Sequence, residues 1–451
     1  MLIRNRPGLS TTALRRNALD LIEAGIERVL PANIMKSAVK YDAARRIVTL
    51  GDYTYPLGRG RIFVTGGGKA AALMAQALEN ILTPGNIAAG VVVCNASCQA
   101  TKKIKVVEAG HPVPDQRGIY AVDEMLALKD RYDIQGNDLI VCLISGGGSA
   151  LMPCPVDGVT LEDKQVTTQL LLRSGASIHE INAVRKRLSK TKGGRLGWHF
   201  SPATVLSLIL SDVIGNDLDV IASGPTCPDL STFLDAHGIL EKYGLLSKAP
   251  KGVLDILTRG CSGVAEETPK TLANCINYII GDNRLALDAM AHKAKALGLT
   301  PCIVTAEQKG DATTVARQRA AEILSGKYAD CNVILIGGET TVTLPDNAGK
   351  GGRNQHYAAT SMLAMSAYSG KWALASVGTD GSDFLPDVAG AMVDDTSLTR
   401  ASSEGIDVEY YFKRYDSYRL FNQLGDSLII TGSTGTNVGD IMVYAFGETP
   451  P

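Results

Sequence analysis

The chain has 451 residues, with 45 Lys and Arg against 46 Asp and Glu and a formal net charge of −1. At about 100–200 residues per domain this length predicts two or three domains, and the balanced charge excludes a general nucleic-acid binder. No apolar run approaches the roughly 20 residues of a membrane span, and the charged N-terminus lacks the apolar block of a secretory signal. Nine scattered cysteines argue against a disulfide scaffold, so we expect a cytoplasmic protein.

Helical and strand-like patterns alternate through the first half of the chain. Apolar residues at helical spacing from Leu14 to Val29 predict an N-terminal helix that ends at Pro31. A second helix is expected to begin at the capping box formed by Ser177 and Glu180. Continuous β-branched runs predict strands at 61–65, 90–94, 104–107, 138–144 and 205–210. Such strands separated by helices are typical of a parallel sheet with both faces covered.

A polar, glycine-rich stretch at 225–270 interrupts this alternation, and we expect the domain change there. Strand-like runs then restart at 278–280, 302–305, 333–336, 373–377, 391–393 and 427–430. The predicted organisation is α/β, with a larger domain at 1–240, a connecting segment at 241–275 and a smaller domain at 276–451. Because α/β sheets bind ligands beyond the carboxyl ends of their strands, two such domains predict a site in the cleft between them.

The loop Gly66-Gly67-Gly68-Lys69 follows the strand at 61–65 and opens a helix. Backbone N–H groups at a helix start attract anions, Gly67 and Gly68 allow a phosphate or carboxylate to approach closely, and Lys69 adds a positive charge. The loop matches the dinucleotide pattern G-x-G-x-x-A but not a Walker loop, and the next strand ends in Cys94-Asn95 without a ribose-binding carboxylate. The sequence therefore indicates nucleotide-type anion binding and disfavours NAD, with a purely structural turn as the alternative.

A second glycine-rich loop, Ser145-Gly146-Gly147-Gly148-Ser149, follows the strand at 138–144. Three glycines between two hydroxyls form a nest of donors that suits phosphate oxygens. A nucleophilic Ser149 is disfavoured, because the surrounding residues do not form a G-x-S-x-G elbow. The basic run near the end of the helix that starts at Ser177 has two interpretations: it is a solvated face that complements the helix dipole, or it brings Arg185 and Lys192 to a polyphosphate.

Polar residues also follow the apolar strand at 205–210. Asp212 stands where a carboxylate binds Mg²⁺ or accepts a proton. Asn216 is a candidate for ligand binding, with a turn residue as the alternative. His111 lies in the sequence His-Pro-Val-Pro and is expected mainly to belong to a rigid turn.

Loops rich in Gly, Thr and carboxylates follow the strands of the second half. Arg353, beside glycines at a helix start, suits bidentate capture of a carboxylate or phosphate. Glu339 and Asp380 lie at strand ends and join Asp212 as candidate metal ligands. The remaining candidates for ligand binding in these loops are Gly338, Gly378 and Thr379.

At this point the ordered motifs resemble the class II glycerate 2-kinase family, which ends in the MOFRL domain. The resemblance covers nearly the whole chain and rests on GGGKAA at 66–71, EAGHPVPD at 108–115, LISGGGSAL at 143–151, SGASIHEINAVRKRLSKTKGGRL at 174–196, LSDVIGNDLDVIASGPT at 210–226, GGETTV at 337–342, GGRNQ at 351–355, VGTDGSD at 377–383 and TGSTGTNVGD at 431–440.

The resemblance implies ATP- and Mg²⁺-dependent phosphorylation of D-glycerate at its 2-hydroxyl, giving 2-phosphoglycerate and ADP. It also implies a Rossmann-like N-terminal domain, a smaller α/β C-terminal domain and an active site in the cleft. The family's essential Lys and Arg correspond to Lys69 and Arg353. In our hypothesis the ATP phosphates lie against the loop at 145–149 and Asp212 orients the 2-hydroxyl. Family members often have Glu after GGRNQ, where this chain has His356.

Three other functions stay open at this stage. One is an NAD(P)H-dependent hydroxypyruvate reductase, another is a kinase for a different small hydroxy acid, and the third is a non-catalytic sensor of phosphorylated metabolites. The expected partners are a small substrate and a nucleotide, with no nucleic acid and no membrane. A homo-oligomer is compatible with the sequence.

Overall fold

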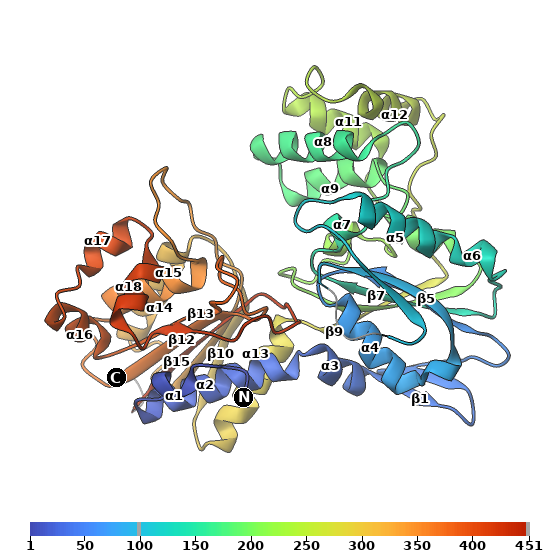
Figure 1. The fold of residues 1–451 in the computed structure, drawn as a ribbon. Coiled ribbons are helices and arrows are strands. Elements are labelled where there is room, and N and C mark those ends of the chain that lie inside the picture. Colours follow the sequence, from blue (N-terminus) through green and yellow to red (C-terminus); the bar gives the residue numbers. More distant parts are fainter. Residues whose placement is uncertain (97–100, 448–451) are drawn as a thin grey trace. The chain divides into compact units, whose positions relative to one another are not determined.

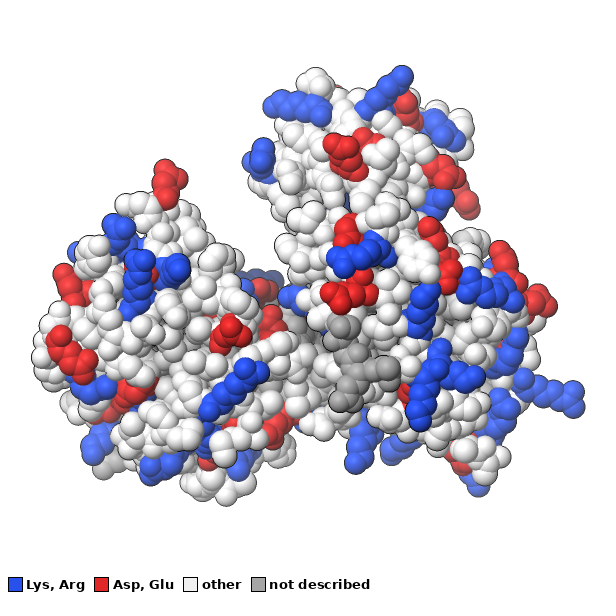
Figure 2. All heavy atoms as spheres, in the orientation of Figure 1, with Lys and Arg blue, Asp and Glu red and all other residues white. Residues whose placement is uncertain are grey.

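The computed structural model describes residues 1–96 and 101–447 and divides the chain into two compact units (Figure 1). One unit comprises Ile34–Ile280, and the other combines Met1–Asn33 with Gly281–Pro451. We call them the middle unit and the terminal unit. On the face drawn in Figure 2, Lys and Arg side chains lie among Asp and Glu side chains. None of the helices in the described ranges is long and apolar enough to span a bilayer.

The middle unit is built on a six-stranded sheet in the order β6-β5-β4-β7-β8-β9. The pairs from β6 to β8 are parallel, as the sequence predicted. Every residue of β4 and β7 is buried, which explains their continuous apolar sequence. The strands are β4 (Ile62–Gly67), β5 (Ile87–Cys94), β6 (Ile104–Glu108), β7 (Leu139–Ser145), β8 (Thr204–Leu210) and β9 (Cys275–Gly281).

Helices and a small sheet cover the two faces of this sheet. One core cluster joins α5 (Gln116–Leu126) and α10 (Arg195–His199) to strand residues such as Ile140 and Val205. On the opposite face, Val141 and Leu206 line one small apolar cavity together with residues of α4 (Ala71–Leu82) and of an antiparallel sheet. The sequence did not predict this second sheet. That sheet consists of β1 (Val39–Asp42), β2 (Ile47–Leu50) and β3 (Tyr53–Pro56).

The expectation of a connecting segment at 241–275 and a domain change within 225–270 differs from the structure. These residues include α11 (Phe233–Lys242) and α12 (Lys251–Cys261), which pack with α8 (Leu161–Arg173) and α9 (Ile178–Arg187) around an apolar core of their own (Figure 1). Phe233, Leu240 and Leu257 are buried in it. The segment is therefore a helical group of the middle unit. Each helix is stabilised by burying a few apolar residues on one face, and these are hard to recognise in a segment that is polar on average. The unit's remaining short elements are α3 (Pro31–Ala38), at which the division falls, η1 (Pro84–Asn86), α6 (Leu128–Arg131), α7 (Gly148–Leu151) and η2 (Ile221–Ser223).

The predicted capping box at the start of α9 is confirmed. Glu180 N–H donates to Ser177 Oγ (3.3 Å), and Ser177 N–H donates to Glu180 Oε2 (2.8 Å). We expect Ser177→Ala to lower the free energy of unfolding by about 1 kcal/mol, because one backbone N–H at the helix start loses its acceptor. Urea denaturation measures this, with Ser177→Asp as the control that keeps an acceptor. An unchanged midpoint for the alanine variant would contradict the prediction.

The terminal unit has a six-stranded mixed sheet in the order β10-β11-β15-β12-β13-β14. Only β10 and β11 pair in parallel; the other neighbours are antiparallel. The central strand β15 was not among the predicted strands. It lies antiparallel between β11 and β12, so the sheet is mixed and not the parallel sheet that alternating strands and helices would form. The strands are β10 (Pro301–Gln308), β11 (Val333–Gly338), β12 (Trp372–Gly378), β13 (Gly390–Asp394), β14 (Leu428–Ile429) and β15 (Asp440–Phe446).

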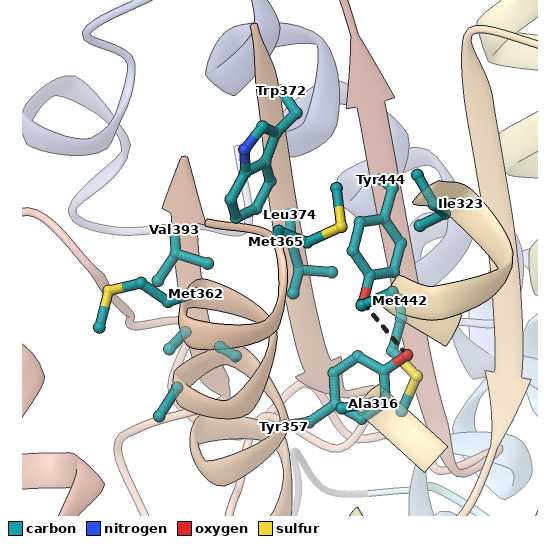
Figure 3. Close-up of a cluster of buried hydrophobic side chains, with 14 of the residues drawn as sticks. Ala316, Ile323, Tyr357, Met362, Met365, Trp372, Leu374, Val393, Met442 and Tyr444 are labelled. Carbon is teal, nitrogen blue, oxygen red and sulfur yellow. Dashed lines mark hydrogen bonds between the residues drawn. The ribbon is translucent and has the colours of Figure 1, made fainter. Parts of the chain in front are cut away.

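Helices lie on both faces of this sheet. The cluster in Figure 3 joins α14 (Ala312–Leu324) and α15 (Arg353–Ala364) to strand residues such as Leu374 and Met442, and within it Tyr444 Oη donates to Tyr357 Oη at 3.4 Å. The opposite face contacts α2 (Ala13–Arg28) and α13 (Asn283–Ala296). The unit's other helices are α1 (Arg6–Leu9), α16 (Ser397–Ser403), α17 (Val408–Lys413) and α18 (Ser417–Leu424).

The N-terminal helix belongs with the C-terminal half, which differs from the expected domain at 1–240. Arg15 in α2 is fully buried and pairs with Asp394 at 2.7 Å. At Gly25 a side chain would collide with Met290 of α13 and Ile441 of β15, so the helix lies directly against both. The apolar stripe from Leu14 to Val29 predicted the helix correctly, but a stripe carries no information about which sheet it covers. The predicted stop at Pro31 is close: α2 ends at Arg28, and Pro31 begins α3.

Candidate active site

Two glycine-rich loops of the middle unit meet at the carboxyl ends of β4 and β7. Lys69 N–H donates to the Gly146 carbonyl (2.8 Å), and Ala70 N–H donates to Ser145 Oγ (3.0 Å). Gly68 has φ of +146°, and a side chain there would overlap Ser145 Oγ. The backbone thus holds Lys69, which is half-buried, beside the loop at 145–149. Adjacent parallel strands produce this meeting because their carboxyl ends share one edge of the sheet.

Asp212 lies over the same loop. A Cβ at Gly146 would overlap Asp212 Oδ2, so only glycine allows the carboxylate to come this close. Asp212 follows β8, the neighbour of β7, and is half-buried. Asn216 lies further along the same loop, where its N–H donates to the Val213 carbonyl and its φ is +57°, so it forms a turn.

His111 is also a member of this site, although the sequence favoured it mainly as part of a rigid turn. A Cβ at Gly147 would lie 2.9 Å from His111 Nε2 and 3.2 Å from Lys69 Cγ, so all three residues are neighbours. Burial lowers the pKa of His111, and the charge of Lys69 lowers it further. His111 is therefore held in its neutral form near neutral pH. We call Lys69, His111, the loop at 145–149 and Asp212 the Lys69 cluster.

Lys192 and Ser149 extend the Lys69 cluster toward the helical group. Lys192 Nζ donates to the Ser149 carbonyl (2.8 Å), and Ser149 Oγ is 2.8 Å from Ser223 Oγ. Arg185 is half-buried, and its Nε donates to Thr168 Oγ1 at 3.4 Å. The structure therefore places Lys192 at the glycine-rich loop, where a polyphosphate was expected, rather than on a solvated helix face.

The terminal unit holds a second group around Arg353, the first residue of α15. Arg353 Nε and Nη2 donate to the Asp440 carboxylate (2.6 and 3.0 Å), and Nη1 is 3.1 Å from Glu339. Burial alone would lower the pKa of Arg353, but the charge and hydrogen bonds of Asp440 outweigh it and raise the pKa. The Arg353 side chain is 32% exposed, so it remains accessible while Asp440 fixes its orientation. We call Arg353, Glu339, Asp440 and Asp383 the Arg353 cluster.

The start of α15 is capped by Asp383, a carboxylate from another loop. Asn354 N–H and Gln355 N–H donate to its two oxygens at 2.9 and 2.8 Å. A side chain at Gly352 would overlap Asp383, which explains a glycine at the N-cap position. Burial raises the pKa of Asp383 to about 6, helped by the charge of Asp440 and opposed by the N–H donors.

Three positions expected to bind ligand are occupied by structural contacts. Gly338 has φ of +146° and lies against the backbone of Gln308. Thr379 is fully buried, and its hydroxyl donates to the Gly439 carbonyl (2.6 Å) and accepts from Val438 N–H (2.9 Å). Gly378 ends β12, where a Cβ would lie 3.3 Å from Asp380 Oδ1. These residues shape the loops beside Arg353, and ligand binding by them stays a prediction.

The candidate metal ligands fall in different units: Asp212 in the middle unit, Glu339 and Asp380 in the terminal unit. Within residues 1–96 and 101–447, no three Asp, Glu, His or Cys side chains converge as a ready-made metal site. Mg²⁺ commonly takes one or two carboxylates and completes its coordination with substrate phosphates and water. Oxygen donors of this kind fit Mg²⁺, provided that phosphate oxygens complete the coordination.

His356, which follows GGRNQ, is directed into the core rather than toward Arg353. Its ring stacks on Phe412 and Tyr415, with ring centroids 4.9 and 4.3 Å apart, and its Nε2 lies 2.9 Å from Thr313 Oγ1. Burial lowers its pKa to about 4. His356 therefore packs as a neutral ring between α15 and the residues Thr313, Phe412 and Tyr415.

The raised pKa of Asp383 has a measurable consequence. Because its folded-state pKa lies above the ordinary value of 3.8, its protonated form favours the fold below about pH 4, and this contribution is lost as the pH rises through about 6. The free energy of unfolding relative to Asp383→Asn should fall across that window by at most about 1.4 kcal/mol per pH unit and then level off. Carboxyl NMR and urea denaturation from pH 4 to 7 measure it. A carboxyl that titrates below pH 4 would contradict the assignment.

Comparisons with known proteins identify the family of the chain. A domain of unknown function, DUF4147, matches residues 17–258, and the MOFRL family matches residues 332–440. The chain is 40% identical to the glycerate 2-kinase of Pyrococcus horikoshii, over 95% of this chain and 97% of that one. It is also 40% identical to a putative hydroxypyruvate reductase of Agrobacterium vitis, over 86% of this chain and all of that one. The crystal structure of glycerate kinase from Thermotoga maritima superposes with a TM-score of 0.84 at 37% identity, over 96% and 99% of the two chains. The chain therefore belongs to the class II glycerate kinase family.

Proposed function

We propose that this chain is an ATP- and Mg²⁺-dependent kinase that phosphorylates the 2-hydroxyl of D-glycerate. The observation that carries the proposal is the Lys69 cluster: a lysine, a glycine-rich nest and a carboxylate at adjacent strand ends. Phosphoryl transfer depends on positioning and charge neutralisation more than on a covalent nucleophile, and these residue types supply both. Glycerate 2-kinase relatives that align over nearly the whole chain support the substrate.

Each residue of the proposed site has a separate role in the transfer. The substrate 2-hydroxyl oxygen forms a bond to the γ-phosphorus of ATP, the bond from that phosphorus to ADP breaks, and the hydroxyl proton passes to Asp212. Lys69 stabilises the negative charge that develops on the transferring group. The loop at 145–149 binds phosphate oxygens, and Arg353 binds the substrate carboxylate or the transferring group.

One or two of Asp212, Glu339 and Asp380 would hold Mg²⁺. When bound, the ion neutralises phosphate charge and lowers the barrier to transfer. Glu339 is 44% exposed and remains accessible beside Arg353. Asp380 Oδ1 accepts the Ser382 N–H at 3.0 Å, which fixes its direction.

The direct test is product identification from ATP, Mg²⁺ and D-glycerate. ADP formation with 2-phosphoglycerate, identified by NMR and mass spectrometry, is the expected result. 3-Phosphoglycerate would overturn the regiochemistry, and transfer to other hydroxy acids in preference to glycerate would overturn the substrate.

A hydroxypyruvate reductase is the second candidate, because a relative of that name is 40% identical to this chain. The reductase would oxidise NADH with hydroxypyruvate and make no ADP from glycerate. The end of β5 at Cys94, followed by Asn95, lacks the carboxylate that usually binds the ribose of NAD. Both assays on one preparation separate the two functions, and binding of ATP and glycerate without turnover would indicate a sensor.

The close approach of Asp212 to Gly146 provides a test of the carboxylate's role. Gly146 is not among the glycines with positive φ, so Gly146→Ala should keep the backbone and displace the Asp212 carboxylate. We expect kcat to fall about 10- to 100-fold in Gly146→Ala, with no further large loss when Asp212→Asn is added. Gly238→Ala, where an added Cβ meets open space, is the control. Additive effects of the two substitutions would contradict the shared mechanism.

A further inference from the structure

Three basic residues of the middle unit lie on neighbouring elements. Lys164 is on α8, Arg185 on α9 bonds to Thr168 one turn after Lys164, and Lys192 lies just after α9. We call them the buried cation cluster. Lys164 is 7% exposed and Lys192 is 2% exposed, while Arg185 is half-buried. Lysine is rarely buried to this extent without an ionic partner.

Charge in this cluster is not balanced by carboxylates. Within the ranges that the structure describes, none of the three residues forms an ion pair, and Lys164 Nζ has no hydrogen-bond partner. Burial lowers the pKa of Lys192 strongly, and the positive charges of Lys164 and Arg185 lower it further. Burial also lowers the pKa of Lys164 to about 8. The charged forms of the three residues therefore repel one another where burial already disfavours charge.

Neutral hydrogen-bonding groups accompany these cations. Lys192 contacts Ser149, whose hydroxyl meets Ser223, and Ser223 Oγ donates to Asn182 Oδ1 at 3.1 Å. Asn182 Nδ2 is buried without a partner. Ser223 and the preceding Ala222 both have positive φ, +62° and +52°, which is strained for residues with side chains. Unpartnered buried donors and a strained backbone both lower the free energy of unfolding. Such features cluster at functional sites, where a bound ligand can accept the donors' hydrogen bonds.

The charge of the cluster selects the ligand. A single carboxylate carries one negative charge and would leave most of the buried cationic charge unbalanced. A phosphate group carries up to two negative charges and three acceptor oxygens, and a polyphosphate carries more. Ser149 and Arg185 are only half-buried, so they form the side of the cluster that faces solvent.

We propose that Lys164, Arg185 and Lys192, with Asn182 and the Ser149–Ser223 hydroxyl pair, form the subsite for the polyphosphate tail of a nucleotide. The proposal rests on the proposed function and adds Lys164, which lies outside the motifs of the sequence, and Asn182, which lies within the motif at 174–196 but was not singled out there. The proposal gives the two substrates different subsites. The buried cation cluster binds the nucleotide, and the carboxylate of glycerate binds elsewhere.

The test uses tripolyphosphate and ADP as probes, with affinities from isothermal titration calorimetry on the full chain. Lys164→Met should weaken both at least tenfold, which corresponds to one lost charge-assisted hydrogen bond, while the KM for D-glycerate stays unchanged. Without ligand, the melting temperature of this variant should rise, because an unpaired buried charge has been replaced by an apolar chain of similar length. Arg185→Gln, at a less buried position, should weaken the probes in the same direction. Lys251→Met is the control, because Lys251 is an exposed lysine at the start of α12.

Several results would overturn the proposal. Unchanged probe affinity in Lys164→Met, with or without a lower melting temperature, would make the lysine structural. A raised KM for glycerate with unchanged probe affinity would assign the cluster to the substrate carboxylate, and binding of 2-phosphoglycerate in competition with ADP would assign it to the product. If the chain lacks kinase activity but Lys164 governs tripolyphosphate affinity, the proposed function fails and the phosphate subsite stands.

Discussion

Replacing Lys69 by Ala should lower kcat for ADP formation by about 10²- to 10⁴-fold while leaving the fold intact. The structural contribution of this residue is its backbone N–H, which donates to the Gly146 carbonyl and is retained in the variant. The side chain supplies a charge beside the glycine-rich loop at 145–149. If this charge acts mainly in the transition state, kcat falls and the KM values for ATP and glycerate change much less.

Steady-state kinetics on the Lys69→Ala and Lys69→Met variants provide the measurement, with circular dichroism and thermal unfolding to verify the fold. Lys40→Ala is the matched control, since Lys40 is an exposed lysine on β1 of the same unit. In Lys69→Ala the pKa of His111 should also rise, because the charge of Lys69 contributes to lowering that pKa. Turnover near that of the unmodified chain would refute the role of Lys69.

Replacing Arg353 by Lys should lower kcat by about 10²-fold or more even though the positive charge is kept. A guanidinium presents five N–H donors in a fixed fork, so it can bind Asp440 with two nitrogens and still bind a ligand. An ammonium on a flexible chain cannot do both. Arg353→Ala should also lower the free energy of unfolding by about 3–5 kcal/mol, because it leaves the fully buried Asp440 carboxylate without its ion pair.

Kinetics of Arg353→Lys and denaturant unfolding of Arg353→Ala separate the two effects. The exposed Arg317, which lies in the same unit on α14, provides the control Arg317→Lys. Adding Asp440→Asn to Arg353→Ala should recover part of the lost stability, since it removes the unpaired charge. Retention of full activity by Arg353→Lys would show that the geometry of the fork is not needed.

Much of the Lys69 cluster was predictable because it is local to three strand ends. Lys69, Ser145 and Asp212 each follow a continuous apolar strand within a few residues, and parallel neighbours place such residues at one edge. The glycines were recognisable for the same reason, although only the structure revealed that Gly146 makes room for Asp212. His111 was undervalued, because nothing in its own sequence neighbourhood reports its contact with Gly147.

Only part of the Arg353 cluster was predictable from the sequence. Arg353 and Glu339 were identifiable from their motifs, but Asp440, 87 residues after Arg353, was not singled out although it ends the motif at 431–440. Asp383 caps α15 from a separate loop, and the sole local signal is Gly352, an N-cap residue that lacks a side chain of its own. Lys164 gave no signal, since one lysine in an ordinary amphipathic helix suggests a solvated face.

The amino-acid sequence alone determined most strands of the two large sheets, the helices that begin near Leu14 and at Ser177, the strand-end loops and the family, because these depend on periodicity and on residues close together in the chain. Only the tertiary structure decided that residues 1–33 pack with the C-terminal sheet, that β15 enters that sheet antiparallel, and that Asp440 orients Arg353. The physical reason is that an apolar stripe or a lone carboxylate specifies burial or charge but not its partner. Partners are selected by packing and by charge compensation across hundreds of residues, which act only once the chain has folded.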